Sequence, residues 1–218
     1  MEEQFSAEEL QELERQLSCP SGEFGIEVAE RMNETNIGMT LSTMDYLDIG
    51  NHQSVLELGH GNCAHLPQLL GLAEGVSYAG LEISETMFEA AKTINHSFSA
   101  DFRLYDGVSI PHEDEAFDRL MSVNSIYFWE QPDVLMKEIE RVLKPGGLCV
   151  LTYAEKDFMK DLPFVGTKFK LFGAEEIKQL VASCDLVIQG FESGQDQMED
   201  KLGVTGNRSY SMVKLRKT

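Results

Sequence analysis

The chain has 218 residues, 42% of them hydrophobic and 25% charged, so it is long enough for one substantial domain and too apolar to be intrinsically disordered. Its formal net charge is −19, from 37 acidic and 18 basic residues. Such a surface repels nucleic-acid phosphates and anionic membranes, and no apolar run is long enough to cross a bilayer, so we expect neither nucleic-acid binding nor stable membrane insertion.

The N-terminal part of the chain is predicted to be helical. Ser6 precedes the segment "AEELQELERQL" and Glu9 follows three residues later, which is the capping-box pattern of a helix start. The proline and glycines of "CPSGEFG" (19–25) then interrupt the helix. Apolar periodicity predicts a second helix from about 26 to 36 and a third over 38–49.

After residue 52, short apolar runs alternate with amphipathic segments. The runs predict strands over 54–58, 76–83, 99–105, 117–124 and 148–154, and the amphipathic segments predict helices over 63–73, 84–95, 132–143 and 174–184. This alternation indicates a parallel sheet with helices on both faces. The last two runs, 186–193 and 209–216, have no helix between them, so they are predicted to pair as an antiparallel hairpin.

Four of the predicted parallel strands end in polar residues or glycines. These residues are Glu57, Gly59 and Gly61 after the first strand, Glu82 after the second, Asp106 and Gly107 after the third, and Asn124 after the fourth. Ligands of open parallel sheets bind outside the carboxyl ends of the strands. Because the carboxyl ends of successive parallel strands meet at one edge, we expect these residues to form a single ligand site.

The residue types at that edge suit a nucleoside. Glycines let the backbone approach a ligand closely, and Glu82 is placed to accept hydrogen bonds from both hydroxyls of a ribose. Asp106 could accept a hydrogen bond from an exocyclic amine such as that of adenine. The stretch "GHGNCA" also satisfies the dinucleotide pattern GxGxxG/A, which leaves NAD open. Glu57, however, favours a cationic amine over a pyrophosphate at this turn.

Together these segments resemble class I S-adenosylmethionine-dependent methyltransferases, particularly the small-molecule type 11 group and the ubiquinone and menaquinone C-methyltransferases. The similarity runs from residue 53 to about 153. "VLELGHGNC" resembles the family's first motif, "YAGLEIS" with the following Met87 its ribose-binding strand, and "YDG" its adenine-contacting segment. "FDRLMSVNSIYFW" and "RVLKPGGLCVLTY" resemble the fourth strand and the turn into the fifth.

The resemblance implies an α/β, three-layer Rossmann-like fold. Its seven-stranded sheet would be mostly parallel, in the order 3-2-1-4-5-7-6, with an antiparallel last strand. An N-terminal helical cap would cover residues 1–50, and an S-adenosylmethionine-binding domain would cover residues 51–218. The resemblance also implies S-adenosylmethionine as cofactor, bound by Glu57, Leu58, Gly59, His60, Gly61, Glu82, Ile83, Met87, Asp106, Gly107 and Asn124.

Cys63 departs from the family, because it stands where the first motif has its third glycine. We expect it to be a tolerated small residue rather than a catalytic thiol. The four cysteines are scattered and the five histidines dispersed, so neither a disulfide framework nor a metal site is predicted. The cysteine usage and the acidic N-terminus favour the cytoplasm over secretion.

Two residues are candidates for a catalytic role, His60 and Tyr127. His60 is either a base that faces the substrate or an exposed loop histidine. Tyr127 either belongs to an aromatic wall of the substrate site or packs against the following helix. Glu57 has as its alternative to ligand binding a role as a helix cap or as the partner of a lysine. The alternative for Glu82 is a solvated surface acid. The methionines of 31–44 have helical spacing and are expected in the core.

The predicted function is methyl transfer from S-adenosylmethionine to a small organic acceptor by in-line displacement. A base is needed only if the acceptor must lose a proton. The N-terminal helices and the segment 156–172 are expected to close the pocket. Two alternatives stay open, an NAD-dependent oxidoreductase and a non-catalytic cofactor-binding partner subunit. The sequence specifies neither the acceptor, nor the atom methylated, nor the oligomeric state.

Overall fold

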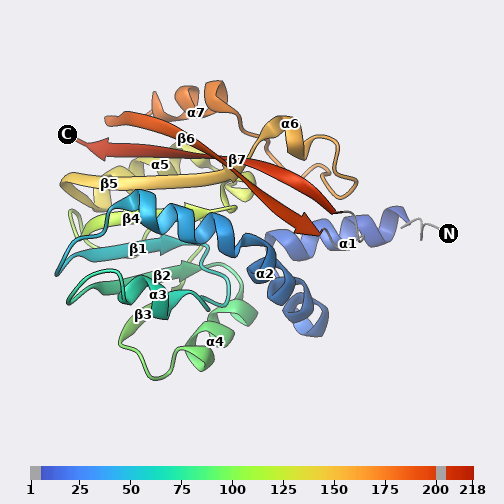
Figure 1. Ribbon diagram of the computed structural model, residues 1–218, viewed down its shortest axis with the longest axis horizontal. Helices are drawn as coiled ribbons and strands as arrows, with labels where there is room; N and C mark the ends of the chain where they lie inside the picture. The colour runs from blue at the N-terminus through green and yellow to red at the C-terminus, as the bar shows by residue number, and fades with distance from the viewer. Residues whose placement is uncertain (1–5, 200–204) are drawn as a thin grey trace.

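A seven-stranded sheet forms the middle layer of the computed structural model, which describes residues 6–199 and 205–218 (Figure 1). The strands are β1 (Ser54–Leu58), β2 (Ser77–Glu82), β3 (Ala100–Leu104), β4 (Phe117–Val123), β5 (Leu143–Ala154), β6 (Leu186–Glu199) and β7 (Thr205–Lys217). Their order is β3-β2-β1-β4-β5-β7-β6. β1 to β5 pair in parallel, whereas β7 is antiparallel to both β5 and β6. The predicted strand order and hairpin are confirmed.

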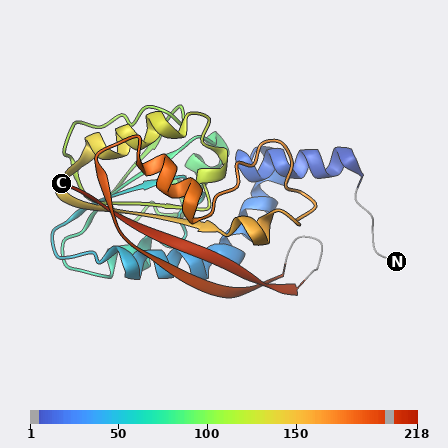
Figure 2. The same cartoon turned by 90° about the horizontal axis from the view of Figure 1, so that it is seen from above.

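Helices cover both faces of the sheet, and α2 and α5 lie on opposite sides of it (Figure 2). They are α1 (Ala7–Ser18), α2 (Gly22–Leu47), α3 (Leu66–Leu70), α4 (Glu85–Ile94), η1 (Ile126–Phe128), α5 (Pro132–Val142), α6 (Lys156–Met159) and α7 (Ala174–Val181). One apolar core joins α5 and α7 to the sheet, and a second joins α2, α3 and α4 to its other face. Residues of β1 alternate between the two cores, as the two-residue period of a strand requires.

The N-terminal helices differ from the prediction in number. α1 begins at Ser6 with the expected capping box to Glu9. The second and third predicted helices, however, form the single 26-residue helix α2. Gly38 does not end this helix, because packing against the sheet and the terminal hairpin outweighs the modest helix cost of one glycine. Met39 and Leu47, in the second half of α2, are fully buried on the sheet.

The remaining boundaries differ by a few residues, and two differences shape the site. α3 is shorter than predicted because Cys63 has a φ of 52° and Pro67 lies in the first helical turn. The β6–β7 hairpin is longer than predicted, and it extends past the rest of the sheet to contact α2 (Figure 1). It thereby brings the last strand of the chain next to the N-terminal helices.

No helix within 6–199 or 205–218 has the length and apolar character that a membrane span requires.

Candidate active site

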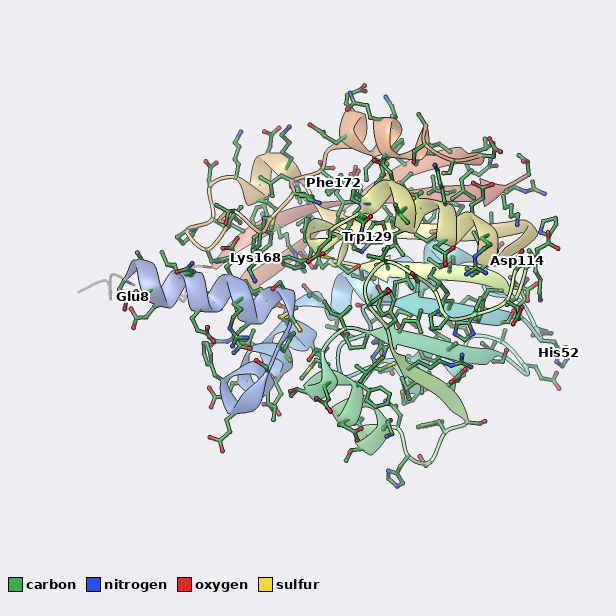
Figure 3. All side chains as sticks on the ribbon, turned by 180° about the vertical axis from the view of Figure 1, so that it is seen from behind. Glu8, His52, Asp114, Trp129, Lys168 and Phe172 are labelled. Carbon is green, nitrogen blue, oxygen red and sulfur yellow. The ribbon has the colours of Figure 1, made fainter. Side chains whose placement is uncertain are left out.

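A cleft opens at the carboxyl ends of the parallel strands, beneath the N-terminal helices. It encloses about 1200 Å³ of space, its open mouth included. Every residue predicted to bind the cofactor lines this cleft except Leu58. Trp129, which also lines it, lies toward the α1 end of the sheet, whereas His52 and Asp114 lie at the opposite end (Figure 3). The strand-end residues therefore converge as the parallel topology requires.

Leu58 does not reach the cleft, because strand alternation points it to the other face of the sheet. Its side chain is fully buried in the core that contains α5, next to the residues of β4. Only its backbone contributes, since its carbonyl oxygen accepts a 2.9 Å hydrogen bond from the Ser122 hydroxyl. The prediction that Leu58 binds the cofactor has no side-chain contact to support it.

The turn after β1 requires glycine at two positions. Gly59 and Gly61 have φ values of 75° and 58°, the left-handed region that side chains with a Cβ disfavour. A Cβ on Gly59 would also lie 2.9 Å from the Cβ of Ser125. The Gly59 amide donates a 2.8 Å hydrogen bond to the Leu81 carbonyl oxygen, which fixes the turn against β2. The turn thus leaves bare backbone beside the cleft.

Cys63, which stands at the position of the first motif's third glycine, has a left-handed backbone with a φ of 52°. Its side chain is buried in the core between the sheet and α2–α4, and the thiol donates a 3.2 Å hydrogen bond to the Tyr78 hydroxyl oxygen. Burial raises the pKa of this thiol well above its usual value. Cys63 does not line the cleft, so it is a packed residue without the thiolate that a nucleophile needs.

Glu57 belongs to a buried network rather than to an exposed strand end. Its Oε2 accepts hydrogen bonds from the Tyr78 hydroxyl (2.6 Å) and from His65 Nε2 (2.8 Å), and the residue is only 2% exposed. Burial alone would raise the pKa of Glu57, but the charge and hydrogen bond of His65 bring it below its ordinary value. Burial would lower the pKa of His65, and Glu57 raises it. The helix-cap and lysine alternatives are wrong, because the partner of Glu57 is His65.

The same cluster brings together three groups that could hold a metal. Ligand atoms of Glu57, Cys63 and His65 lie within 4.8 Å of one another, which the dispersed histidines of the sequence did not indicate. Each of these groups already has a hydrogen-bond partner within the cluster or in Tyr78. Hydrogen bonding therefore accounts for the cluster, and its place beneath the glycine turn indicates a structural role.

Glu82 is buried at the end of β2, so the prediction of a solvated surface acid as its alternative is wrong. Its Oε2 accepts a 2.9 Å hydrogen bond from the Gly61 amide, and its Oε1 accepts from the amides of Ile83 (2.8 Å) and Ser84 (3.0 Å). Three backbone donors fix the carboxylate, and one of them belongs to the glycine turn. A carboxylate has about four lone-pair sites, so one site is left for a ribose hydroxyl.

His60 is not an exposed loop histidine, because the structure buries it beside the glycine turn. The residue is 3% exposed, and its ring packs 5.0 Å from the ring of Phe102 on β3. Its Nδ1 lies 2.7 Å from the Gly61 carbonyl oxygen. Burial lowers the pKa of His60, which favours the neutral ring. It lines the base of the cleft, where it supports the turn.

The turn after β3 closes the far end of the cleft. Asp106 is exposed, and its Oδ1 accepts hydrogen bonds from the amides of Val108 (2.8 Å) and Ser109 (2.7 Å). These backbone hydrogen bonds lower the pKa of Asp106. Gly107 has a φ of 79°, and a Cβ there would lie 3.5 Å from the side chain of Ile83. Asp106 is therefore both a turn residue and part of the cleft wall.

A second cavity adjoins the cleft and encloses about 680 Å³ of space. The two share a wall of residues from α1, α2 and the region after β4. These residues are Leu17, Met32, Asn36, Asn124 and Phe128. The rest of the second cavity is mostly apolar, and five of its residues belong to the segment 156–172, namely Phe158, Met159, Leu162, Phe164 and Phe169. The predicted closing segments do line this cavity.

Tyr127 lines the second cavity, but its hydroxyl is fully engaged. It donates a 2.9 Å hydrogen bond to Asn124 Oδ1 and accepts a hydrogen bond from the Ala154 amide. Burial raises its pKa far above the usual value. The ring lies 5.8 Å from Phe169. Tyr127 thus lies in the cavity wall, the position that the aromatic-wall prediction gave it, and its role as a base has no support.

Several lining residues had no signal in the sequence. Asn33, Asn36 and Thr40 of α2 reach the cleft because this helix is continuous and crosses the strand ends, which its predicted division into two helices obscured. Met32 also lines both cavities, so the expectation of a core position is wrong for Met32 and confirmed for Met39 and Met44.

Residues 56–151 match the methyltransferase domain family of type 11. The matched segment, 96 of the 218 residues, corresponds to a class I S-adenosylmethionine-dependent methyltransferase domain. S-adenosylmethionine is the methyl donor of this family, and the match favours it over the NAD-dependent alternative. The cleft fits that donor, because the glycine turn offers bare backbone and Glu82 retains acceptor capacity.

The chain is similar to methyltransferases whose names include lipid-like molecules. It is 27% identical over 128 residues to phthiotriol/phenolphthiotriol dimycocerosates methyltransferase of Mycobacterium tuberculosis, covering 59% of this chain and 47% of that protein. It is 25% identical over 171 residues to fatty-acid O-methyltransferase of Mycolicibacterium smegmatis, covering 78% and 61%. The chain thus spans about half the length of the first of these relatives.

The fold is shared with solved structures of low sequence identity. A chain from the complex between the Haloferax volcanii Trm112 methyltransferase activator and a methyltransferase superposes with a TM-score of 0.70 and 17% identity, covering 85% of this chain and 92% of that chain. At this identity the likeness establishes the fold alone.

Proposed function

We propose that the protein transfers the methyl group of S-adenosylmethionine, bound in the cleft, to a small apolar acceptor bound in the second cavity. The observation that carries this proposal is the shared wall between the two cavities. The cleft has more polar groups in its lining than the second cavity, which is lined mainly by phenylalanine, leucine and methionine. Molecules bound in the two cavities would meet at Asn36, Asn124 and Phe128.

The cleft residues have distinct roles in this proposal. Glu82 would accept a hydrogen bond from a ribose hydroxyl, Asp106 would accept one from the adenine amine, and Glu57 would supply negative potential near the ammonium group. Gly59 and Gly61 would let the backbone approach the donor. Met87, which is 2% exposed, adds an apolar contact.

The bound donor supplies an electrophilic methyl group on a sulfonium, so no covalent enzyme intermediate is needed. The protein would hold the acceptor in line with the methyl group and exclude water, which can supply much of the rate acceleration. Phe128 and Trp129 form apolar surface at the junction of the cavities. The cap predicted over residues 1–50 would close the site from above.

Two findings support an apolar acceptor. The second cavity has an aromatic cluster in its wall, with the ring of Phe169 4.7 Å from Phe128 and 6.2 Å from Phe164. The names of two relatives also denote lipid-like molecules. Apolar lining of this kind favours ligands that lose apolar surface to the pocket on binding.

Calorimetric titration with S-adenosylhomocysteine, NAD and ATP tests the donor assignment. We expect only S-adenosylhomocysteine to bind, and at 100 times its dissociation constant it should add about 2.7 kcal/mol to the free energy of unfolding. Glu82→Ala should weaken this binding at least 30-fold, because it removes the anchor of the glycine turn. The exposed Glu85→Gln, three positions along the chain, is the control and should change it less than twofold.

Binding of NAD in place of S-adenosylhomocysteine would contradict the proposal. Binding of S-adenosylhomocysteine without methyl transfer to any member of a broad acceptor panel would favour the non-catalytic partner subunit instead.

A further inference from the structure

A chain of hydrogen bonds with fixed direction runs from the terminal hairpin to the wall between the two cavities. It begins at Arg208, which is 4% exposed and forms a two-point ion pair with Asp196 (2.6 and 3.0 Å). Arg208 also donates to the Thr35 carbonyl oxygen (2.6 Å) and to Asn36 Oδ1 (2.7 Å). A guanidinium has donors only, so Asn36 must present its oxygen, not its amide nitrogen, to Arg208.

The next links of the chain are fixed in the same way. Asn124 Nδ2 donates to the same Asn36 oxygen at 2.9 Å. Asn124 therefore presents its oxygen to Tyr127, whose hydroxyl donates to it and accepts from the Ala154 amide. The Asn36 Nδ2 group is left over. It has no hydrogen-bond partner among the residues that the structure describes, and Asn36 lines both cavities.

The charged residues that line the second cavity are both arginines. Its lining contains no aspartate, glutamate, histidine or lysine among the described residues, and its two charged residues are Arg31 and Arg208. Arg208 is matched by Asp196. The Arg31 side chain is exposed at the rim and forms no ion pair or hydrogen bond with a described residue. In a chain of net charge −19, this cavity is locally suited to an anion.

The second cavity also lacks a proton acceptor. Tyr127 is the one uncharged group of its described lining that could ionise, and its hydroxyl is engaged in two hydrogen bonds. An alcohol acceptor must lose a proton to become an effective nucleophile. A carboxylic acid is already ionised at neutral pH. The cavity therefore suits an acceptor that needs no base.

We propose that the acceptor is an apolar carboxylic acid, bound as its carboxylate by a hydrogen bond from Asn36 Nδ2. This inference rests on the proposed function. Asn36 is then the residue that selects the acceptor group. At the rim of the cavity, the positive charge of Arg31 offsets the repulsion that the acidic protein exerts on an anion. The apolar tail of the acid lies against the phenylalanine side chains of the cavity.

The reaction balances without a base. One carboxylate oxygen forms a bond to the methyl carbon while the carbon–sulfur bond breaks, and the bonding electron pair stays on sulfur. The products are a methyl ester and S-adenosylhomocysteine, and no proton is transferred. The negative and positive charges of the two reactants cancel in this step, which an apolar, water-excluding cavity favours.

Titration of decanoate and decan-1-ol by calorimetry tests the carboxylate assignment, with and without saturating S-adenosylhomocysteine. We expect decanoate to bind at least tenfold more tightly than decan-1-ol. Asn36→Asp is the decisive variant, because aspartate keeps an oxygen for Arg208 and Asn124 but replaces the free donor by a second oxygen. It should weaken decanoate binding at least tenfold and change decan-1-ol binding less than twofold.

Ile37→Asp is the matched control, because it adds the same charge at the next position of α2, on an exposed side chain outside both cavities. It should weaken decanoate binding less than twofold. With S-adenosylmethionine, the wild-type protein should form methyl decanoate at a rate that changes less than twofold between about pH 6.5 and 8.5.

Three results would overturn the inference: failure of decanoate to bind, equal binding of decan-1-ol, or Asn36→Asp behaving like Ile37→Asp. Each of them leaves the proposed function intact, provided that S-adenosylhomocysteine binds in the cleft. Failure of S-adenosylhomocysteine to bind would contradict the proposed function, and the titrations without it would still test the carboxylate site.

Discussion

The cleft and the second cavity adjoin each other but are built in different ways. The cleft is formed mainly by short turns that directly follow consecutive strands, and its carboxylates Glu57 and Glu82 are each held by several hydrogen bonds. The second cavity combines both N-terminal helices, the segment 156–172 and Arg208 of the last strand. The contrast teaches that the cleft follows from local sequence around the sheet, whereas the second cavity depends on segments that meet only in the folded protein.

The largest effect is expected beneath the cleft, where His65→Leu should leave the buried Glu57 charge without its ion-pair partner. We expect the free energy of unfolding to fall by about 3 to 5 kcal/mol near pH 6.5. Urea denaturation measures it, and His96→Leu, at an exposed histidine, is the control with an expected change below about 0.5 kcal/mol. Equal effects of the two variants would mean that the network does not support the cleft.

The same pair predicts a pH dependence. The raised pKa of His65 means that its stabilisation is complete below its ordinary pKa of 6.5 and is lost as pH rises through the raised value. The lowered pKa of Glu57 means that its stabilisation is complete above its ordinary value of 4.5 and is lost as pH falls through the lowered one. The difference in unfolding free energy between the wild-type protein and His65→Leu should therefore narrow at both ends of a pH series.

A smaller effect on stability is expected at the glycine turn. A substitution there should weaken ligand binding in the cleft but not in the second cavity. Gly59→Ala combines a left-handed φ, which costs about 1 to 2 kcal/mol, with a 2.9 Å contact to Ser125. Gly22→Ala has a φ of 67° but no atom within 4 Å of the added Cβ, so it measures the backbone cost alone. Gly59→Ala should be the less stable variant and should weaken S-adenosylhomocysteine binding at least tenfold, with decanoate binding in the absence of S-adenosylhomocysteine little changed. Equal stability would show that Ser125 can move aside.

The smallest effect on stability is expected in the second cavity. Phe169→Ala removes a half-buried ring and should lower the free energy of unfolding by about 1 to 2 kcal/mol. It should weaken decanoate binding severalfold and leave S-adenosylhomocysteine binding within twofold, as calorimetry would measure. Phe98→Ala, at a ring that is 40% exposed and outside both cavities, should change neither. Loss of S-adenosylhomocysteine binding in Phe169→Ala would show that the two cavities are not separable.

The strand-end residues of the cleft could be predicted because the two-residue period of β1 and the positions of the turns are local properties. Gly59, Glu82 and Asp106 were placed from such signals, and all three line the cleft. The partners of Glu57 could not be predicted. Tyr78 lies on the neighbouring strand, and His65 lies in the irregular segment before α3, which begins later than predicted. Leu58 does not line the cleft, because membership of a motif does not determine which face of the sheet a side chain takes.

By itself, the sequence determined the order of the strands and of α3, α4, α5 and α7, the hairpin at the end of the chain and the set of turns that converge at one edge of the sheet. These features follow from periodicity, glycine positions and the topology of parallel strands, all of which act over short stretches of chain. Only the tertiary structure decided that α2 is one helix, that Asn36 meets Arg208 across 172 positions of sequence, and that an apolar cavity without a base lies beside the cleft. Such contacts depend on how distant surfaces fit together, which no local pattern of residues records.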